Sequence, residues 1–183
     1  LLGAIELTPL QLTSLYTSFG NGGFKLPIRT IKNVRDQNNN LVRQYPAELM
    51  PSLSPQTAAL MQYALIQVAR NGTAKAIANK FPGQKLAGKT GTSDNFRDSW
   101  FIGLSANYLT TVWIGHDNNS TTGLSGSSGA LQAWLEMMKV MGIGGFGSTK
   151  GKQVESNSSG AALGSAKTVC YVMIVCVVLL FIL

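Results

Sequence analysis

The stretch KLAGKTGTSDNFRDSWFIGL, at residues 85–104, decides the fold and raises the first functional question. It contains a Lys-Thr-Gly triplet at residues 89–91 and, one residue later, a Ser-Asp-Asn triplet at residues 93–95. Gly88 and Gly91 carry no side chains, so an extended peptide could approach this segment and pair with its backbone as an added strand. The stretch therefore predicts a strand whose edge binds a peptide.

Three runs of apolar or β-branched residues predict the sheet to which this strand belongs. They are separated by turn-forming residues and occupy residues 85–92, 100–105 and 109–115. Runs of this length with turns between them favour three successive antiparallel strands. Further upstream, apolar and polar residues alternate on both sides of a polar loop at residues 36–40, which predicts a separate hairpin.

Three helices are expected around these strands. Thr8-Pro9 and Ser54-Pro55 each place a capping residue before a proline at the first helical position. The first helix should end at Gly20 and the second at Asn71-Gly72, and a third should cover residues 128–141. The expected inner-face residues are Leu12, Leu15, Tyr16 and Phe19 in the first helix, Leu60, Ala64, Leu65 and Val68 in the second, and Leu131, Trp134, Leu135 and Met138 in the third. Helices that bracket a run of strands predict an α+β fold in which helices cover an antiparallel sheet.

The composition is that of one folded domain. Of the 183 residues, 45% are hydrophobic and 13% are charged, which is typical of a globular chain with a core. The formal net charge of +7 is spread thinly over the domain rather than gathered in basic runs, and this argues against nucleic-acid binding. The chain has a single histidine and no cluster of metal-ligand residues, so we expect neither a metal nor a cofactor.

The composition changes twice toward the C-terminus and suggests three segments. Residues 1–146 form the domain, residues 147–168 are small, polar and without apolar period, as in a flexible linker, and residues 169–183 are uncharged and strongly apolar. As a helix the last segment would span only about 22 Å, short of the ~30 Å hydrocarbon core of a bilayer. Three interpretations stay open for it: a membrane segment, a cleaved lipid-anchor signal, or fused sequence unrelated to the domain.

Several segments resemble one protein family in the same order. LLGAIELTPLQLTSLYTSFGNGG, VARNGTA, LAGKTGTSDNFRDSWFIG and WIGHDNN are similar to the transpeptidase domain of class A, bifunctional penicillin-binding proteins, most like the 1B type. The resemblance covers roughly residues 1–140. It implies the penicillin-binding transpeptidase fold, incomplete at the N-terminal side, and a location at the extracytoplasmic, periplasmic face of the bacterial cell membrane.

The resemblance also implies a substrate and a role for each motif residue. In the family this strand binds the D-Ala-D-Ala end of a peptidoglycan stem peptide, or a β-lactam that imitates it. Lys89 would place a positive charge beside the nucleophile and the substrate carboxylate, and would assist proton movement. Thr90, Gly91 and Thr92 would bind the substrate, the two threonines through their hydroxyls. The backbone N–H of Thr92 would be one of two oxyanion donors.

The remaining family motifs are not found where the chemistry needs them. No serine in the sequence has a lysine three positions later, so the nucleophile of a Ser-x-x-K motif is absent. Ser93-Asp94-Asn95 and Ser105-Ala106-Asn107 match the second motif, Ser-x-Asn, by letter. Both lie in turns beside the strand, whereas the family places that motif across the cleft, so we interpret both as chance matches.

These absences leave several functions open. Both missing motifs normally precede the segment that begins at Leu1, which favours a piece of a longer D,D-transpeptidase that does not catalyse alone. The residues do not distinguish a transpeptidase from a carboxypeptidase or a β-lactamase. The competing hypothesis is a non-catalytic protein, either a remnant or a tail-anchored binding domain of the same fold.

Overall fold

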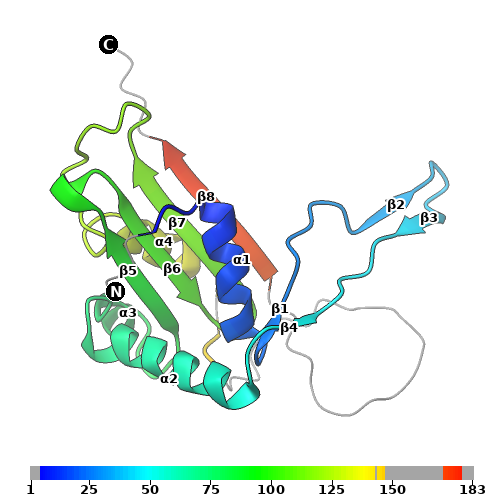
Figure 1. Ribbon diagram of the computed structural model, residues 1–183, viewed down its shortest axis with the longest axis horizontal. Coiled ribbons are helices and arrows are strands. Elements are labelled where there is room, and N and C mark those ends of the chain that lie inside the picture. The colour runs from blue at the N-terminus through cyan, green and yellow to red at the C-terminus, as the bar shows by residue number, and fades with distance from the viewer. Residues whose placement is uncertain (1–4, 143, 147–170, 179–183) are drawn as a thin grey trace.

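A four-stranded sheet lies at the centre of the fold (Figure 1). The structure is a computed structural model that describes residues 5–142, 144–146 and 171–178, the last of these by their backbone. The strands lie in the order β5-β6-β7-β8. Their bounds are β5 Ala87–Thr92, β6 Ser99–Leu104, β7 Tyr108–Gly115 and β8 Tyr171–Val178.

Helices cover both faces of this sheet, which confirms the α+β class. Helix α1 (Pro9–Gly20) lies on one face and α4 (Ala130–Met141) on the other. Helix α2 (Pro55–Asn71) runs beside β5, and the short α3 (Ala76–Lys80) follows it. The expected third helix is therefore present as α4.

Local capping residues start the first two helices, as the sequence predicts. The Thr8 hydroxyl accepts a hydrogen bond from the backbone N–H of Gln11 at 3.2 Å, and the Thr8 N–H donates to the Gln11 side chain at 2.9 Å. Ser54 accepts from the backbone N–H of Thr57 at 3.1 Å. Each cap hydroxyl accepts a hydrogen bond from an N–H group that has no intrahelical partner in the first turn of the helix.

The strands β5, β6 and β7 pair antiparallel in succession, which confirms the predicted meander. In the register, Ala87 of β5 lies opposite Leu104, and Leu104 lies opposite Leu109 of β7. Successive side chains of a strand point to opposite faces. Consequently Leu104 packs toward α1 and α2, while its neighbour Gly103 faces α4.

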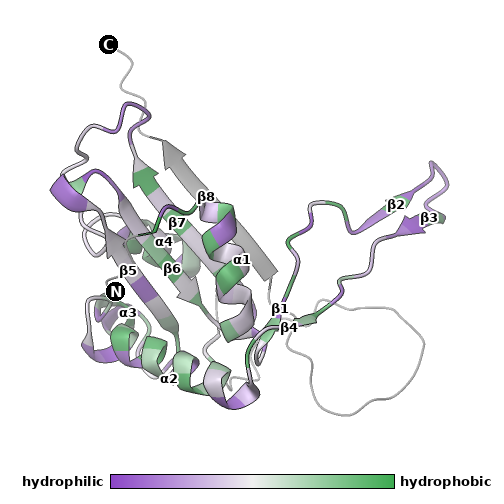
Figure 2. Cartoon of the chain, viewed as in Figure 1, coloured by the Kyte–Doolittle hydropathy of each residue, from purple (hydrophilic) through white to green (hydrophobic). Residues whose placement is uncertain are grey.

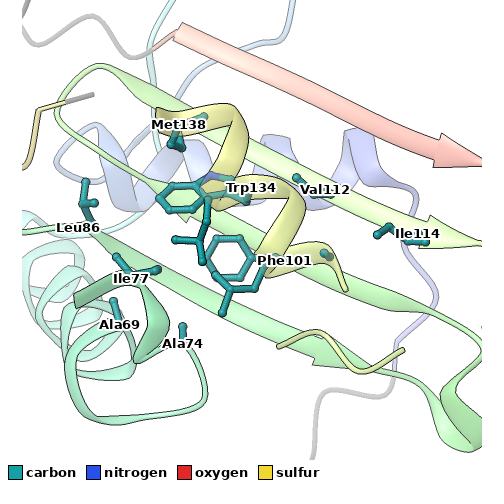
Figure 3. Packing of buried hydrophobic residues seen from close by; sticks show 12 residues of the cluster. Ala69, Ala74, Ile77, Leu86, Phe101, Val112, Ile114, Trp134 and Met138 are labelled. Carbon is teal, nitrogen blue, oxygen red and sulfur yellow. The ribbon is translucent and has the colours of Figure 1, made fainter. Parts of the chain in front are cut away.

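The larger hydrophobic cluster lies between the sheet and α4 (Figure 3). Trp134 is 1% exposed and its ring meets that of Phe101 edge-on, with centroids 5.1 Å apart. A Cβ at Gly103 would overlap the Trp134 indole, so only glycine leaves room for this ring. The inner-face residues expected for α4 are all buried: Leu131, Trp134, Leu135 and Met138.

The inner faces of α1 and α2 differ in part from the expectation. Leu15 is 49% exposed and Leu60 is 68% exposed, and Ala64 is exposed as well. In α1, the buried positions are Thr13, Thr17 and Ser18, and in α2 they are Ala58, Leu65 and Ala69. Small and hydroxyl-bearing residues let these helices lie close to the sheet. A search for large apolar residues at helical spacing therefore does not identify the buried face of either helix.

A hydroxyl contact joins α1 to the sheet. The Oγ1 atoms of Thr13 and Thr111 lie 2.7 Å apart, and the Thr13 hydroxyl also lies 2.6 Å from the carbonyl oxygen of Pro9. The Thr17 hydroxyl accepts from the Leu26 N–H at 3.0 Å and donates to the Ser14 carbonyl at 2.7 Å. These bonds satisfy polar groups that would otherwise be costly to bury.

The predicted hairpin is present and extends away from the sheet (Figure 1). It consists of β2 (Asn33–Arg35) and β3 (Leu41–Gln44), at whose base β1 (Phe24–Lys25) pairs with β4 (Met50–Pro51). Figure 2 shows that its tip is mostly hydrophilic. The Asp36 carboxylate accepts bonds from Asn38 and Asn40 in the loop, and the Asn40 side chain lowers the pKa of Asp36.

The apolar tail is a strand where the structure describes it. A membrane span at residues 169–183 would require a helix, yet Tyr171–Val178 pair with β7 in parallel as β8. The uncharged, β-branched composition of this segment suits a strand as well as a helix. In the described part of the chain, no helix is long and apolar enough to cross a bilayer. The expected linker at 147–168 lies outside the described residues.

Candidate active-site wall

The outer edge of β5 carries the Lys-Thr-Gly motif. The backbone N–H of Ser93 donates to the carbonyl of Asp98 at 3.2 Å, just beyond the end of the β5–β6 ladder. Along an antiparallel strand, the backbone N–H and C=O groups of one residue bond to the partner strand, and those of the next residue point away from it. Gly91 and Lys89 therefore bond toward β6, whereas the N–H and C=O groups of Thr90 and Thr92 point to the outer edge of the sheet.

Lys89 places its charge at this outer edge. Its Nζ donates to the carbonyl oxygen of Thr90 at 2.7 Å, and the side chain is exposed. Lys89 lies opposite Ile102 in the register and so shares the face of the sheet that α1 covers. An anion that approached the edge of β5 would meet this ammonium group directly.

The Thr90 hydroxyl is already positioned by a partner from another element. Its Oγ1 lies 2.6 Å from the Oγ1 of Thr73, in the turn that follows α2. Thr90 is 9% exposed, while Thr73 is exposed. In such a pair one hydroxyl donates its proton to the other, and the second hydroxyl can still donate its own proton to a ligand. The sequence alone does not indicate this partner, although Thr73 belongs to the VARNGTA segment that resembles the family.

Thr92 lies on the same face of the sheet as Thr90 and is held by the loop that precedes α4. Its hydroxyl accepts a hydrogen bond from the backbone N–H of Gly126 at 2.9 Å. A Cβ at Gly126 would lie 2.5 Å from the carbonyl oxygen of Gly91 and 2.6 Å from that of Trp100, so the loop lies directly on the β5–β6 ladder. Sequence reasoning missed Gly126, since its only signal is one glycine in a loop rich in glycine and serine.

Replacement of Gly126 tests whether the loop determines the position of Thr92. We expect Gly126→Ala to lower the free energy of unfolding by about 1–3 kcal/mol, because the added methyl group must push the loop off Gly91. The φ angle of Gly126 is not left-handed, so the cost is steric. Urea unfolding measures it, with Ser127→Ala in the same loop as the control that should change little. Equal stability of the two variants would contradict the close contact.

Gly88 and Gly91 each have a packing reason to lack a side chain. A Cβ at Gly88 would lie 2.5 Å from Cζ of Phe101, and one at Gly91 would lie 3.1 Å from Cβ of Trp100. Both lack side chains because β6 occupies the space. That the missing side chain of Gly88 also leaves the edge of β5 open to a peptide stays a prediction. At Gly91 the tight contact also involves β6, and a substrate role for this residue stays a prediction.

The Ser-Asp-Asn triplet lies in the turn that leaves β5. Ser93 donates to the Asp98 carboxylate at 2.8 Å and accepts from the Asp98 N–H at the same distance. Asp94–Phe96 form a single 3-10 turn, η1. Ser105 lies in the β6–β7 turn, where its hydroxyl accepts from the N–H of Tyr108 at 3.0 Å. The hydroxyls of both serines therefore make hydrogen bonds within turns, and neither serine lies across a cleft from β5.

Asp98 connects this turn to the sheet. Besides Ser93, its carboxylate accepts the indole N–H of Trp113 at 2.9 Å. Trp100 packs beside Trp113, with centroids 6.0 Å apart, rather than between sheet and helix as Phe101 does. Asp98 thus holds the turn against the sheet, whereas Trp100 lies outside the buried cluster.

The loss of the Asp98 carboxylate should weaken the turn measurably. We expect Asp98→Ala to lower the free energy of unfolding by about 1–3 kcal/mol, since the Trp113 and Ser93 donors lose their acceptor. Asp94→Ala, an exposed acid in the same turn, should change it by less than about 0.5 kcal/mol. Urea titrations followed by tryptophan fluorescence compare the two variants. Similar midpoints for both would show that Asp98 does not hold the turn.

One further cluster of polar residues lies away from β5. A surface hollow of about 250 Å³ lies between α3 and α4, and it contains the ion pair of Lys80 with Glu136 at 2.8 Å. The hydrogen bond from Lys80 lowers the pKa of Glu136. This hollow includes none of the motif residues. Across the described part of the chain, no three His, Cys, Asp or Glu side chains form a group that could hold a metal ion.

Comparison with known proteins decides the family. The profile described as the penicillin binding protein transpeptidase domain matches residues 2–139. The chain belongs to the penicillin-binding protein transpeptidase family. This confirms the resemblance seen in the motifs. A second profile, described as U4/U6.U5 small nuclear ribonucleoproteins, matches only residues 133–169, well under half of the chain, and supports no assignment.

Class A penicillin-binding proteins are among the relatives. The chain is 37% identical to penicillin-binding protein 1B of Vibrio cholerae over 139 residues, which cover 76% of this chain and 18% of that protein. It is 34% identical to penicillin-binding protein 1B of Escherichia coli over 134 residues, covering 73% and 16%. The chain therefore spans less than a fifth of the length of these relatives.

Solved structures share the fold. The crystal structure of penicillin-binding protein 1A from Haemophilus influenzae matches with a TM-score of 0.70 at 24% identity, over 85% of this chain and 28% of that one. The penicillin G acyl-enzyme complex of penicillin-binding protein A from Mycobacterium tuberculosis matches with a TM-score of 0.53 at 19% identity, over 75% and 32%. At these identities the likeness shows the transpeptidase fold alone.

Proposed function

We propose that this chain supplies one wall of a D,D-transpeptidase active site, the wall that binds the peptidoglycan stem peptide or a β-lactam. The observation that carries the proposal is the outer edge of β5. There the Thr90 and Thr92 backbone groups point away from the sheet, and Lys89 Nζ lies 2.7 Å from the Thr90 carbonyl. A peptide ending in a carboxylate fits such an edge, because it can pair with the strand and place its charge near the lysine.

Each group has a role in acyl transfer. The Lys89 ammonium attracts the terminal carboxylate, and the hydroxyls of Thr90 and Thr92 donate to it. The outward N–H of Thr92 donates to the oxyanion that forms when a serine hydroxyl attacks the penultimate carbonyl carbon. Collapse of this intermediate breaks the amide C–N bond, and the departing D-Ala amine takes a proton. An amine of a second stem peptide then attacks the acyl-serine and releases the serine.

The serine itself must come from residues outside these 183, since none of the serines here precedes a lysine by three positions. The proposal is therefore that of a fragment whose partner segment carries the nucleophile. Attack by water instead of an amine would make the enzyme a carboxypeptidase or a β-lactamase, and the residues of β5 serve all three reactions. A non-catalytic remnant or binding domain of the same fold is the second candidate.

We place the domain at the extracytoplasmic, periplasmic face of the bacterial cell membrane, where peptidoglycan is assembled. The class A resemblance supports this location. Membrane association through residues 169–183 remains an alternative within the proposal. It would require residues 171–178 to leave β7, with which all eight pair.

A chimera tests the proposal. Residues 1–146 would be fused behind the part of Vibrio cholerae penicillin-binding protein 1B that precedes its matched 139 residues. We expect the chimera to form a covalent adduct with fluorescent penicillin at a rate comparable to the parent protein. A folded chimera that is not labelled, while the parent is, would show that this chain cannot serve as the wall.

A further inference from the structure

Phe96 has a backbone conformation that disfavours a large side chain. Its φ angle is 53°, and that of the preceding Asn95 is 58°, so both residues lie in the left-handed region. In the described part of the chain, the other non-glycine residues with such a φ are also asparagines, Asn39 and Asn119. Asparagine tolerates this region, whereas a bulky residue there is strained. An aromatic residue at position 96 therefore needs a physical reason.

Interior packing does not supply that reason. Phe96 is 51% exposed and belongs to neither hydrophobic cluster of the described residues. The loop that precedes α4 holds the strained backbone in place. The hydroxyl and the N–H of Thr122 donate to the Phe96 carbonyl at 2.7 and 2.8 Å, and the Thr121 hydroxyl donates to the Asn95 carbonyl at 2.7 Å. Strain that neighbouring segments maintain is typical of binding and catalytic sites.

The same loop fixes this turn relative to the motif strand. The turn joins the end of β5 to the start of β6 (Figure 1). Thr121 and Thr122 bind the turn, and Gly126, a few residues later, donates its N–H to the Thr92 hydroxyl at 2.9 Å. Phe96 is consequently held in a defined position beyond the last residue of the Lys-Thr-Gly strand.

The proposed ligand extends toward this turn. Its terminal carboxylate lies near Lys89 and its penultimate carbonyl near the Thr92 N–H, so it runs along the β5 edge antiparallel to the strand. An extended chain advances about 3.3 Å per residue. The group on the amino side of the penultimate residue therefore passes Thr92 and reaches residues 93–96. In a stem peptide this group is the preceding residue, and in a penicillin it is the acyl side chain.

We propose that Phe96 is a specificity-determining residue of the β5 edge, whose ring contacts the group on the amino side of the penultimate residue. An exposed ring favours an apolar or aromatic group at that position. Because the loop fixes the turn before a ligand arrives, little further ordering is needed on binding. The inference rests on the proposed function and adds a preference for one part of the ligand.

Two penicillins that differ in this group test the inference in the chimera. Benzylpenicillin carries an aromatic acyl group, and 6-aminopenicillanic acid carries none. We expect Phe96→Asn to lower the ratio of their second-order acylation rate constants at least ~5-fold, because only benzylpenicillin loses a contact. Phe96→Tyr retains a ring and should keep the ratio within about twofold. Competition with fluorescent penicillin measures both rate constants.

Phe24→Asn is the matched control. Phe24 is a second exposed phenylalanine, at 39%, and it lies in β1 at the base of the hairpin rather than beside β5. We expect this variant to keep the ratio of the unmodified chimera. An unchanged ratio in Phe96→Asn would overturn this inference alone. A folded chimera that neither penicillin acylates would overturn the proposed function as well.

Urea unfolding of the full chain tests the strain independently of any activity. Asparagine adopts a left-handed φ at little cost, so Phe96→Asn should leave the unfolding midpoint unchanged or raise it. A lower midpoint would show that the ring stabilises the fold. That result would overturn the proposal, because packing would then explain the aromatic residue without a ligand.

Discussion

Lys89→Ala in the chimera should slow acylation by penicillin about 100-fold or more. The ammonium group lies 2.7 Å from an outward-pointing carbonyl of β5, where it can attract the ligand carboxylate and assist proton movement. Groups that act as general acids or bases, or that stabilise developing charge, typically contribute 10²–10⁴-fold to a rate. The second-order rate constant of labelling with fluorescent penicillin measures the effect.

Lys85→Ala is the matched control for this experiment. Lys85 is an exposed lysine two residues before β5 begins, and its carbonyl bonds to the backbone N–H of Phe146, a bond that the substitution keeps. Its removal changes the net charge by the same amount, and we expect labelling within about twofold of the unmodified chimera. Equal slowing by both substitutions would show a general charge effect, and no slowing by Lys89→Ala would remove Lys89 from the site.

Trp134→Ala should cause the largest loss of stability, about 3–5 kcal/mol in the free energy of unfolding. The indole fills the space between α4 and the sheet, with edge contacts to Phe101 and to Phe81. Its neighbour Gly103 provides no side chain that could fill the space left behind. Urea unfolding of the full chain, followed by circular dichroism, gives the difference.

Val140 provides the control on the same helix. It is 88% exposed, and Val140→Ala should change the free energy of unfolding by less than about 0.5 kcal/mol. If Trp134→Ala were as stable as Val140→Ala, α4 would not pack on the sheet as described. A Trp134→Phe variant should recover part of the loss, because a smaller aromatic ring still contacts Phe101.

Elements whose ends are decided by local chemistry could be predicted from the sequence. The pairs Thr8-Pro9 and Ser54-Pro55 begin α1 and α2, since an N-cap bond and a fixed proline φ depend only on adjacent residues. The three strands of the meander follow from short β-branched runs with polar turns between them. The Lys-Thr-Gly motif was expected on the first of these strands and lies there, on β5.

Features that depend on distant contacts could not be predicted. Leu15 and Leu60 have helical spacing yet are exposed, because Thr13 and Ala58 allow closer approach to the sheet. The contacts of Thr73 with Thr90 and of Gly126 with Gly91 join segments that only the tertiary fold brings together.

A further example is the start of α4. Its N-cap position, Gly129, has no side chain, and the buried Ser99 of β6 accepts from the Ala130 N–H at 2.8 Å in its place. A Cβ at residue 129 would lie 2.6 Å from the Ser99 hydroxyl oxygen, which explains the glycine. A cap supplied by a strand thirty-one residues away leaves no local pattern.

Labelling of this chain alone with fluorescent penicillin, beside the chimera, tests the central claim most directly. The claim is that the chain carries the Lys-Thr-Gly wall of a transpeptidase site and that the nucleophile lies elsewhere. We predict a covalent band on a denaturing gel for the chimera and none for the chain of 183 residues. A band from the chain alone that disappears with Ser93→Ala or Ser105→Ala would contradict the claim, because a serine now assigned to a turn would then be the nucleophile.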